Sequence, residues 1–252
     1  RIQIIWIICI MDRVVIHSGI LCGYSSRKES LTTLDSKITV VIPTRNELAE
    51  NLIKATYSQH PRIQYYLHFD ETDEEYKRKA DWVKARLAHR SNIHIAVERC
   101  GLIEAQNKGV EFAGDGYFMY QHGHDFIGGG IFSLATFLDS DNAAYAYGTL
   151  QYTGLLQQKT YPTQYDGEEL YKWDFPRNAV LYRASIVRNV GGYRRIHNNW
   201  AISTNEEHVL NLDLHEAGYK GCAVSTESPA LYFGVHRGGL TETMANNVEF
   251  LN

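Results

Sequence analysis

The chain has 252 residues, of which 44% are hydrophobic and 21% are charged, and its formal net charge is −4 at pH 7. This length suffices for one large domain, or two small ones, with a sizeable core. The negative charge argues against a protein that coats nucleic acid, which would carry a basic stripe, and it leaves room for a local basic cleft that binds a phosphorylated small molecule.

Residues 1–36 are predicted to be an N-terminal extension or linker. Residues 2–11 (IQIIWIICIM) form an apolar run that is shorter than a membrane span, which needs about 20 residues. We expect buried strands or an added hairpin here, and the alternative is a membrane-facing or signal-like element. Residues 25–37 (SSRKESLTTLDSK) are polar and predict a linker to the folded domain.

Strand-like and helix-like segments alternate between residues 38 and 121. The predicted strands cover residues 38–44, 63–69, 93–97 and 117–121, and the predicted helices cover 47–59, 73–90 and 102–114. β-Branched strands separated by amphipathic helices are typical of a parallel sheet with helices on its faces. We therefore predict the α/β class, with a Rossmann-like, mostly parallel central sheet flanked by helices.

The second half of the chain is less regular. It predicts a helix from near Ile131 to residue 140, a strand and its turn at 142–154, a strand and helix at 179–193, a helix at 205–218, and strands at 221–225 and 230–236. Residues 157–178 are rich in aromatic side chains and show no clean period, which predicts a long loop or irregular excursion. Such excursions often hold acceptors or lids.

Polar side chains follow three of the predicted strands at the point where each strand ends. They lie at residues 44–47 (TRNE), 70–73 (DETD) and 122–125 (HGHD). The carboxyl ends of parallel strands share one edge of a sheet, and ligands bind at that edge. The sequence therefore predicts a ligand site there.

The four cysteines are Cys9, Cys22, Cys100 and Cys222. Their spacing contains no C-x-x-C motif and suggests neither a disulfide framework nor a zinc knuckle. A reducing compartment follows as the simplest interpretation. We expect a cytoplasmic protein, with the cytoplasmic face of a membrane as the alternative location.

Over roughly residues 37–240 the chain resembles the family 2 glycosyltransferases, which have the GT-A fold. The resemblance rests on motifs that follow one another in the family's order: VVIPTRNE (40–47), HFDETDEE (68–75), GLIEAQNKGVEFAGDGYFMYQHGHD (101–125), AVLYRASIVRNVGGY (179–193) and NEEHVLNLDLHEAGYKG (205–221). It implies a single GT-A domain at 37–252, with a nucleotide-sugar-binding half at 37–127 and a more irregular acceptor-binding half at 128–252.

The resemblance implies an inverting transfer of sugar from a nucleotide-diphosphate sugar to a hydroxyl of a glycan, lipid or protein-linked acceptor, as in polysaccharide biosynthesis. Nucleic acid is not an expected partner. Membrane association would arise through the acceptor or through residues 2–11. The alternative is a catalytically inactive GT-A-like binding or scaffolding domain, because a motif of the family is changed here.

Asp70 follows a strand and can accept hydrogen bonds from the base or the ribose of the donor. A solvated turn or a helix N-cap is the alternative, because DETDEE also begins a helix. Lys108 could contact the donor or be a solvated surface charge, and the sequence favours neither role. In all, the resemblance assigns the nucleotide sugar to Thr44, Arg45, Glu47, Asp70, Asn107, Lys108, His122 and Arg237.

The changed motif lies after the fourth strand, where the family has Asp-x-Asp and a divalent cation, Mn²⁺ or Mg²⁺, that bridges the diphosphate. This chain has His122-Gly123-His124-Asp125. Imidazole suits Zn²⁺, Co²⁺ or Ni²⁺ better than hard cations, so the usual ion is in doubt. One interpretation is a metal site of His124, Asp125 and His236. The others are direct contact of histidines and Arg237 with the diphosphate, or histidines that only pack in a loop.

The resemblance places the catalytic base in the pair Glu206-Glu207, where Glu207 matches the family's base position and Glu206 its supporting neighbour. Inverting transfer needs a carboxylate that takes the proton from the acceptor hydroxyl. A helix N-terminus keeps such a carboxylate ionised, and helix-start electrostatics alone is the alternative role. Trp173 and Trp200 are expected to stack on an acceptor sugar, although core packing explains them equally well.

Overall fold

The computed structural model describes residues 36–44, 48–70, 74–153, 158–159, 165–171, 176, 178–194 and 206–234. The predicted extension, apart from Ser36, lies outside the described residues, and the predicted division into halves at residues 127 and 128 stays a prediction. None of the helices in the described ranges combines the length and apolar character of a membrane-spanning segment.

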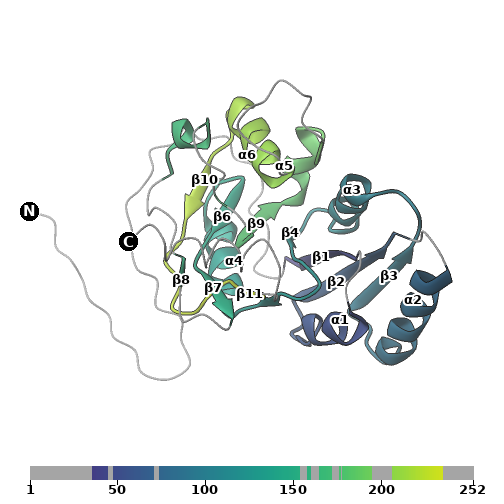
Figure 1. The fold of residues 1–252 in the computed structure, drawn as a ribbon. Coiled ribbons are helices and arrows are strands. Elements are labelled where there is room, and N and C mark those ends of the chain that lie inside the picture. Colours follow the sequence, from purple (N-terminus) through teal and green to yellow (C-terminus); the bar gives the residue numbers. More distant parts are fainter. Residues whose placement is uncertain are drawn as a thin grey trace, which may run out of the picture. The chain divides into compact units, whose positions relative to one another are not determined.

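A seven-stranded sheet forms the centre of the fold (Figure 1), with the order β10-β6-β9-β4-β1-β2-β3. β9 runs antiparallel to its neighbours β4 and β6, while the other pairs in this sheet are parallel. The α/β class with a mostly parallel sheet is therefore confirmed. The strands are β1 (Ile38–Thr44), β2 (Ile63–Phe69), β3 (Ile93–Val97), β4 (Tyr117–Tyr120), β6 (Tyr145–Tyr147), β9 (Val180–Arg183) and β10 (Gly221–Ala223).

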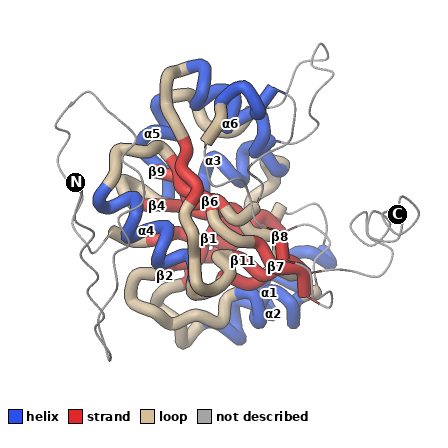
Figure 2. Tube along the Cα trace, turned by 90° about the vertical axis from the view of Figure 1, so that its left-hand side faces the viewer, coloured by secondary structure: helices blue, strands red, loops and turns tan. Residues whose placement is uncertain are grey.

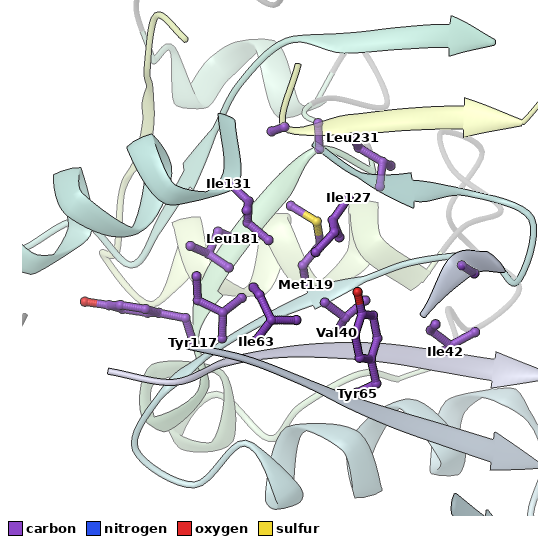
Figure 3. Packing of buried hydrophobic residues seen from close by; sticks show 14 of the residues in the cluster. Val40, Ile42, Ile63, Tyr65, Tyr117, Met119, Ile127, Ile131, Leu181 and Leu231 are labelled. Atoms are coloured by element: carbon purple, nitrogen blue, oxygen red, sulfur yellow. The ribbon is translucent and has the colours of Figure 1, made fainter. Parts of the chain in front are cut away.

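Helices cover both faces of this sheet. Alternate residues of a strand point to opposite faces, so each face presents its own set of apolar side chains to a layer of helices. Val40 and Ile42 pack in a cluster with α1 (Ala49–Ala55), α2 (Glu74–Leu87) and α4 (Gly130–Ser140). Val41 packs in a second cluster with α3 (Leu102–Phe112), α5 (Ala184–Asn189) and α6 (Glu206–Glu216). Figure 2 shows strands of the sheet between α3 and α6 on one side and α1 and α2 on the other. Figure 3 shows part of the first cluster, with Ile131 near Leu181 and Ile127 at one end and Ile42 at the other, beyond Val40.

A second, four-stranded sheet has the order β5-β11-β7-β8. Its strands are β5 (Phe126–Ile127), β11 (Leu231–Gly234), β7 (Leu150–Thr153) and β8 (Gln158–Lys159). β5 follows the His-Gly-His-Asp segment at once and pairs with β11 through Tyr232 and Phe126. This pairing brings the end of β4 beside residues that lie more than a hundred positions later in the chain.

The predicted elements agree best in the first half. The strands predicted at 38–44, 63–69 and 93–97 are confirmed residue for residue, and the strand predicted at 117–121 ends at Tyr120. The helix predicted at 47–59 covers only Ala49–Ala55. The single strand predicted at 142–154 was wrong, because β6 and β7 belong to different sheets. The region predicted to be irregular at 157–178 contains β8 and a 3₁₀ helix, η1 (Gly167–Tyr171).

Gly109 lets α3 lie close to β1, and its replacement tests this packing. A Cβ atom at Gly109 would lie 2.3 Å from Cγ1 of the buried Val41. Gly109→Ala is expected to lower the free energy of unfolding by about 1–2 kcal/mol. This is a net value, because alanine stabilises a helix by roughly 1 kcal/mol relative to glycine and so offsets part of the steric cost. The melting temperature should fall by about 2–4 °C for each kcal/mol in a chain of this size. Glu111→Ala, on the exposed side of α3, is the control, and equal melting of both variants would contradict the prediction.

Candidate functional site

The carboxyl ends of β1, β2, β3 and β4 share one edge of the central sheet, because these strands are parallel. Thr44, Asp70 and His122 therefore lie at this edge, as the sequence predicted. The amino end of the antiparallel β9 lies at the same edge, since Val180 pairs with the last residue of β6, Tyr147. Ligands of open α/β sheets bind at such an edge.

Asp70 ties the end of β2 to the start of α3. Its Oδ1 atom accepts the backbone N–H groups of Cys100 and Gly101, at 2.9 and 3.3 Å. The carboxylate thus satisfies donors that precede α3, whereas the sequence suggested a cap on the helix that follows Asp70 itself. A contact between Asp70 and a nucleotide stays a prediction.

Thr44 and Asn107, two further predicted donor-binding residues, make contacts within the protein. The buried hydroxyl of Thr44 donates to the carbonyl of His68 at 3.1 Å. The amide of Asn107 holds the backbone of Tyr193 from both sides: Nδ2 donates to its carbonyl at 3.0 Å, and Oδ1 accepts its N–H at 2.7 Å. These bonds give both side chains a structural role, and their contact with a donor stays a prediction.

Lys108 forms an ion pair with Glu98, which directly follows β3. Hydrogen bonding between the two side chains raises the pKa of Lys108 and lowers the pKa of Glu98. Lys108 is therefore a paired, partly exposed charge, and its contact with a donor stays a prediction. It would have to exchange partners to bind a diphosphate.

The His122–Asp125 turn follows β4 and is closed by its own side chain. Asp125 is fully buried, and its Oδ2 atom accepts the backbone N–H of His122 at 3.2 Å. The two imidazole rings stack with centroids 5.4 Å apart and planes 8° apart. Phe233 of β11 packs edge-on against both rings. The second sheet therefore holds the turn in place. Phe233 shapes the site, and no pattern in the sequence pointed to it.

His124 and Asp125 supply two donors that a cation could use, since Nε2 of His124 lies 3.6 Å from Oδ1 of Asp125. Within the described residues, no three His, Cys, Asp or Glu side chains are grouped so that they could hold a metal ion. His236, the third predicted ligand, lies outside the described residues. The described donors therefore fit a divalent cation only together with a further ligand.

Glu207 is the second residue of α6 and is 4% exposed, whereas Glu206, which begins the helix, is only partly buried. The Oε2 atom of Glu207 accepts the backbone N–H of Asn178 at 3.3 Å. Asn178 precedes β9, so this contact brings the start of α6 to the same edge of the sheet as the His122–Asp125 turn. A buried carboxylate at a ligand-binding edge can take a proton from a bound hydroxyl.

Tyr193 and Tyr120 connect the acidic pair with the histidine turn. Tyr193 interacts electrostatically with both glutamates of the pair and with Tyr120. Burial raises the pKa of Tyr193 well above its usual range, so this phenol stays neutral. The hydroxyl of Tyr120 lies 3.3 Å from Nδ1 of His122. A carboxylate pair and two imidazoles are therefore grouped around two tyrosines at one edge.

The remaining predicted site residues lie outside the described residues. Arg45 and Glu47 were predicted to bind the donor, and Trp173 and Trp200 to stack on the acceptor. His236 was predicted as a metal ligand and Arg237 as a contact of the diphosphate.

No protein-family model and no curated protein matches this sequence. Solved structures of S. aureus TarS residues 1–349, a glycosyltransferase, are similar in fold. The uncomplexed form has a TM-score of 0.54 and 12% identity over 79% of this chain. The complex with UDP-GlcNAc has a TM-score of 0.56, and the complex with UDP 0.54, each at 13% identity over 82% of this chain. The chain spans 60–63% of the TarS structures. At this identity the likeness establishes only that the chain shares the fold of these structures, and membership of family 2 stays a prediction.

Proposed function

We propose that this protein is a glycosyltransferase that moves a sugar from a nucleotide-diphosphate sugar to an acceptor hydroxyl with inversion. The observation that carries the proposal is the buried carboxylate of Glu207, anchored on Asn178 at the ligand-binding edge of a glycosyltransferase-like sheet. The likeness to TarS in complex with UDP-GlcNAc and with UDP supports a nucleotide-sugar donor.

In the proposed reaction Glu207 takes the proton of the acceptor hydroxyl. The acceptor oxygen then bonds to the anomeric carbon from the side opposite the diphosphate. The bond between that carbon and the diphosphate oxygen breaks, and the nucleoside diphosphate leaves with the electron pair. Glu206 lies beside this base and is proposed as its supporting neighbour. General-base catalysis of this kind contributes about 10² to 10⁴ in rate.

The diphosphate end of the donor is assigned to the histidine turn. In the first version His124, Asp125 and His236 hold a divalent cation, which would neutralise negative charge on the diphosphate. In the second version His122, His124 and Arg237 contact the diphosphate directly. Both versions belong to the proposal, because the turn has two imidazoles where the family has carboxylates, and an imidazole can ligate a cation or contact a diphosphate.

The acceptor is proposed to be a glycan or a lipid-linked sugar that stacks on Trp173 and Trp200. A lipid-linked acceptor would bring the enzyme to the cytoplasmic face of a membrane. The second candidate function is an inactive binding or scaffolding domain, favoured by the replacement of the family's Asp-x-Asp by His122-Gly123-His124.

Nucleotide binding and turnover test the proposal together. Purified protein is mixed with UDP and other nucleoside diphosphates, with and without Mn²⁺, and its melting temperature is measured. A ligand at about 100 times its Kd should add about 2.7 kcal/mol to the stability of the native state. A panel of nucleotide sugars that begins with UDP-GlcNAc is then tested for consumption. Binding without consumption would favour the scaffolding role, and the absence of both would contradict the proposal.

Two substitutions at Asp70 separate nucleotide contact from structural support. Asp70→Ala should weaken nucleotide binding by about 1–3 kcal/mol, the scale of a lost hydrogen bond to a charged group. Asp70→Asn keeps an oxygen that accepts the N–H groups of Cys100 and Gly101 but removes the charge. If the carboxylate contacts the base or ribose, both variants weaken binding in calorimetry. Wild-type affinity in Asp70→Asn would limit Asp70 to its support of α3.

A further inference from the structure

The segment before β9 reaches the start of α6 through a residue with an uncommon backbone conformation. Asn178 has a φ of 64°, in the left-handed region that asparagine tolerates better than most residues. In this conformation its backbone N–H donates to Oε2 of Glu207 at 3.3 Å. Asn178 is itself 6% exposed, so the contact is shielded from water.

Asn211 lies one helical turn after Glu207 and faces the same segment. It is fully buried in α6, where its Nδ2 donates to the carbonyl of Pro176 at 3.1 Å. Its Oδ1 accepts the hydroxyl of Tyr182, on β9, at 2.9 Å. A buried amide is costly unless it is hydrogen-bonded, and here both of its ends are used. Asn211 therefore joins α6 to β9 and to Pro176, which lies two positions before Asn178.

We propose that Asn211 and Asn178 are positioning residues for Glu207. Asn211 holds the segment against α6, and Asn178 then presents its N–H to one carboxylate oxygen of the base. The proposal rests on the role of Glu207 as the base in the proposed function. It goes beyond that function by assigning the orientation and charge state of the base to two residues that contact the base or the chain beside it.

The expected consequence is a base that stays ionised at lower pH. An N–H donor favours the charged form of a carboxylate, so its loss moves the acid limb of the pH–rate profile to higher pH. Among the described residues, Tyr182 and Tyr193 face Glu207 from other elements, and Glu206 lies beside it on α6. Burial raises the pKa of both phenols well above their usual range, so neither tyrosine changes charge in an assay near neutral pH.

The test measures kcat and KM against pH for the nucleotide sugar that the purified chain consumes. Asn178→Val, which disfavours the left-handed conformation, and Asn211→Leu, which removes both side-chain bonds, should each move the acid limb up by about one pH unit and lower kcat about tenfold. The donor KM should change less than about twofold, because neither asparagine is assigned to donor binding. Asn178→Gly keeps the N–H and adopts this φ readily, so it should restore the wild-type limb. Asn189→Leu, on the exposed end of α5, is the matched control.

The outcomes separate this inference from the function on which it rests. If Glu207→Gln keeps its full rate, the base assignment and this inference both fail. If Glu207→Gln is slow but Asn178→Val keeps the wild-type acid limb, only the positioning role is overturned. The pair of Asn178 variants decides the matter where Asn211→Leu does not fold, and melting temperatures of all variants show which ones are folded.

Discussion

Glu207→Gln is expected to lower the rate of sugar transfer by about 10² to 10⁴, the usual contribution of a general base. Glutamine keeps the size of the side chain, and its amide oxygen can still accept the N–H of Asn178, but it cannot take the proton of the acceptor. Glu206→Gln should lower the rate less, since Glu206 is the more exposed member of the pair. Initial rates of nucleoside diphosphate release measure both effects.

The control for this prediction is nucleotide affinity. Binding of the nucleoside diphosphate, measured by calorimetry, should stay nearly unchanged in Glu207→Gln, because this carboxylate acts on the acceptor. If Glu206→Gln is slow and Glu207→Gln is not, the base is Glu206 and the register of the pair is off by one. If both variants are fully active, the base lies elsewhere in the chain and the assignment by resemblance fails.

The first half of the fold could be predicted because its signals are local. The runs at 38–44, 63–69 and 93–97 are rich in apolar residues that are β-branched or aromatic, and amphipathic helices separate them. β5 and β8 are only two residues long, and their partners lie far away in the chain, so no local pattern marks them. β6 and β7 look like one strand in the sequence because only residues 148 and 149 separate them, although they belong to different sheets.

The positions of Asp70 and the histidine turn at the sheet edge could be predicted, the roles of the candidate site residues stay predictions, and their supporting contacts were missed. Strand ends and family motifs pointed to Glu207, Asp70 and the histidine turn. The contacts of Asp70 with Cys100 and of Glu207 with Asn178 join residues about thirty positions apart, which periodicity cannot show. Asn211 had one faint signal, a polar residue four positions after Glu207 in an otherwise apolar stretch of helix.

Removal of divalent cations is expected to lower transfer about 10²-fold or more, if a cation supplies several kcal/mol of charge stabilisation to the leaving diphosphate. EDTA should abolish activity, and Mn²⁺ or Co²⁺ should restore it. Co²⁺ should restore it at least as well, because imidazole suits Co²⁺ better than Mn²⁺. Asp125→Asn should lose this response while its amide oxygen still accepts the N–H of His122, so that the turn stays closed.

The metal-free version makes the opposite forecast from the same residues. Full activity in EDTA, with no metal found by elemental analysis of the protein, would assign the diphosphate to imidazoles and Arg237.

His124→Gln decides how the turn acts. It removes the ring whose Nε2 atom lies 3.6 Å from Oδ1 of the fully buried Asp125. In the metal version this variant should raise the concentration of Mn²⁺ or Co²⁺ needed for half activity. In the direct version it should weaken nucleoside diphosphate binding equally with and without added metal. A His124→Gln variant that is unchanged in both measurements would leave the two histidines as packing residues held by Phe233, and the diphosphate would have to bind elsewhere on the edge.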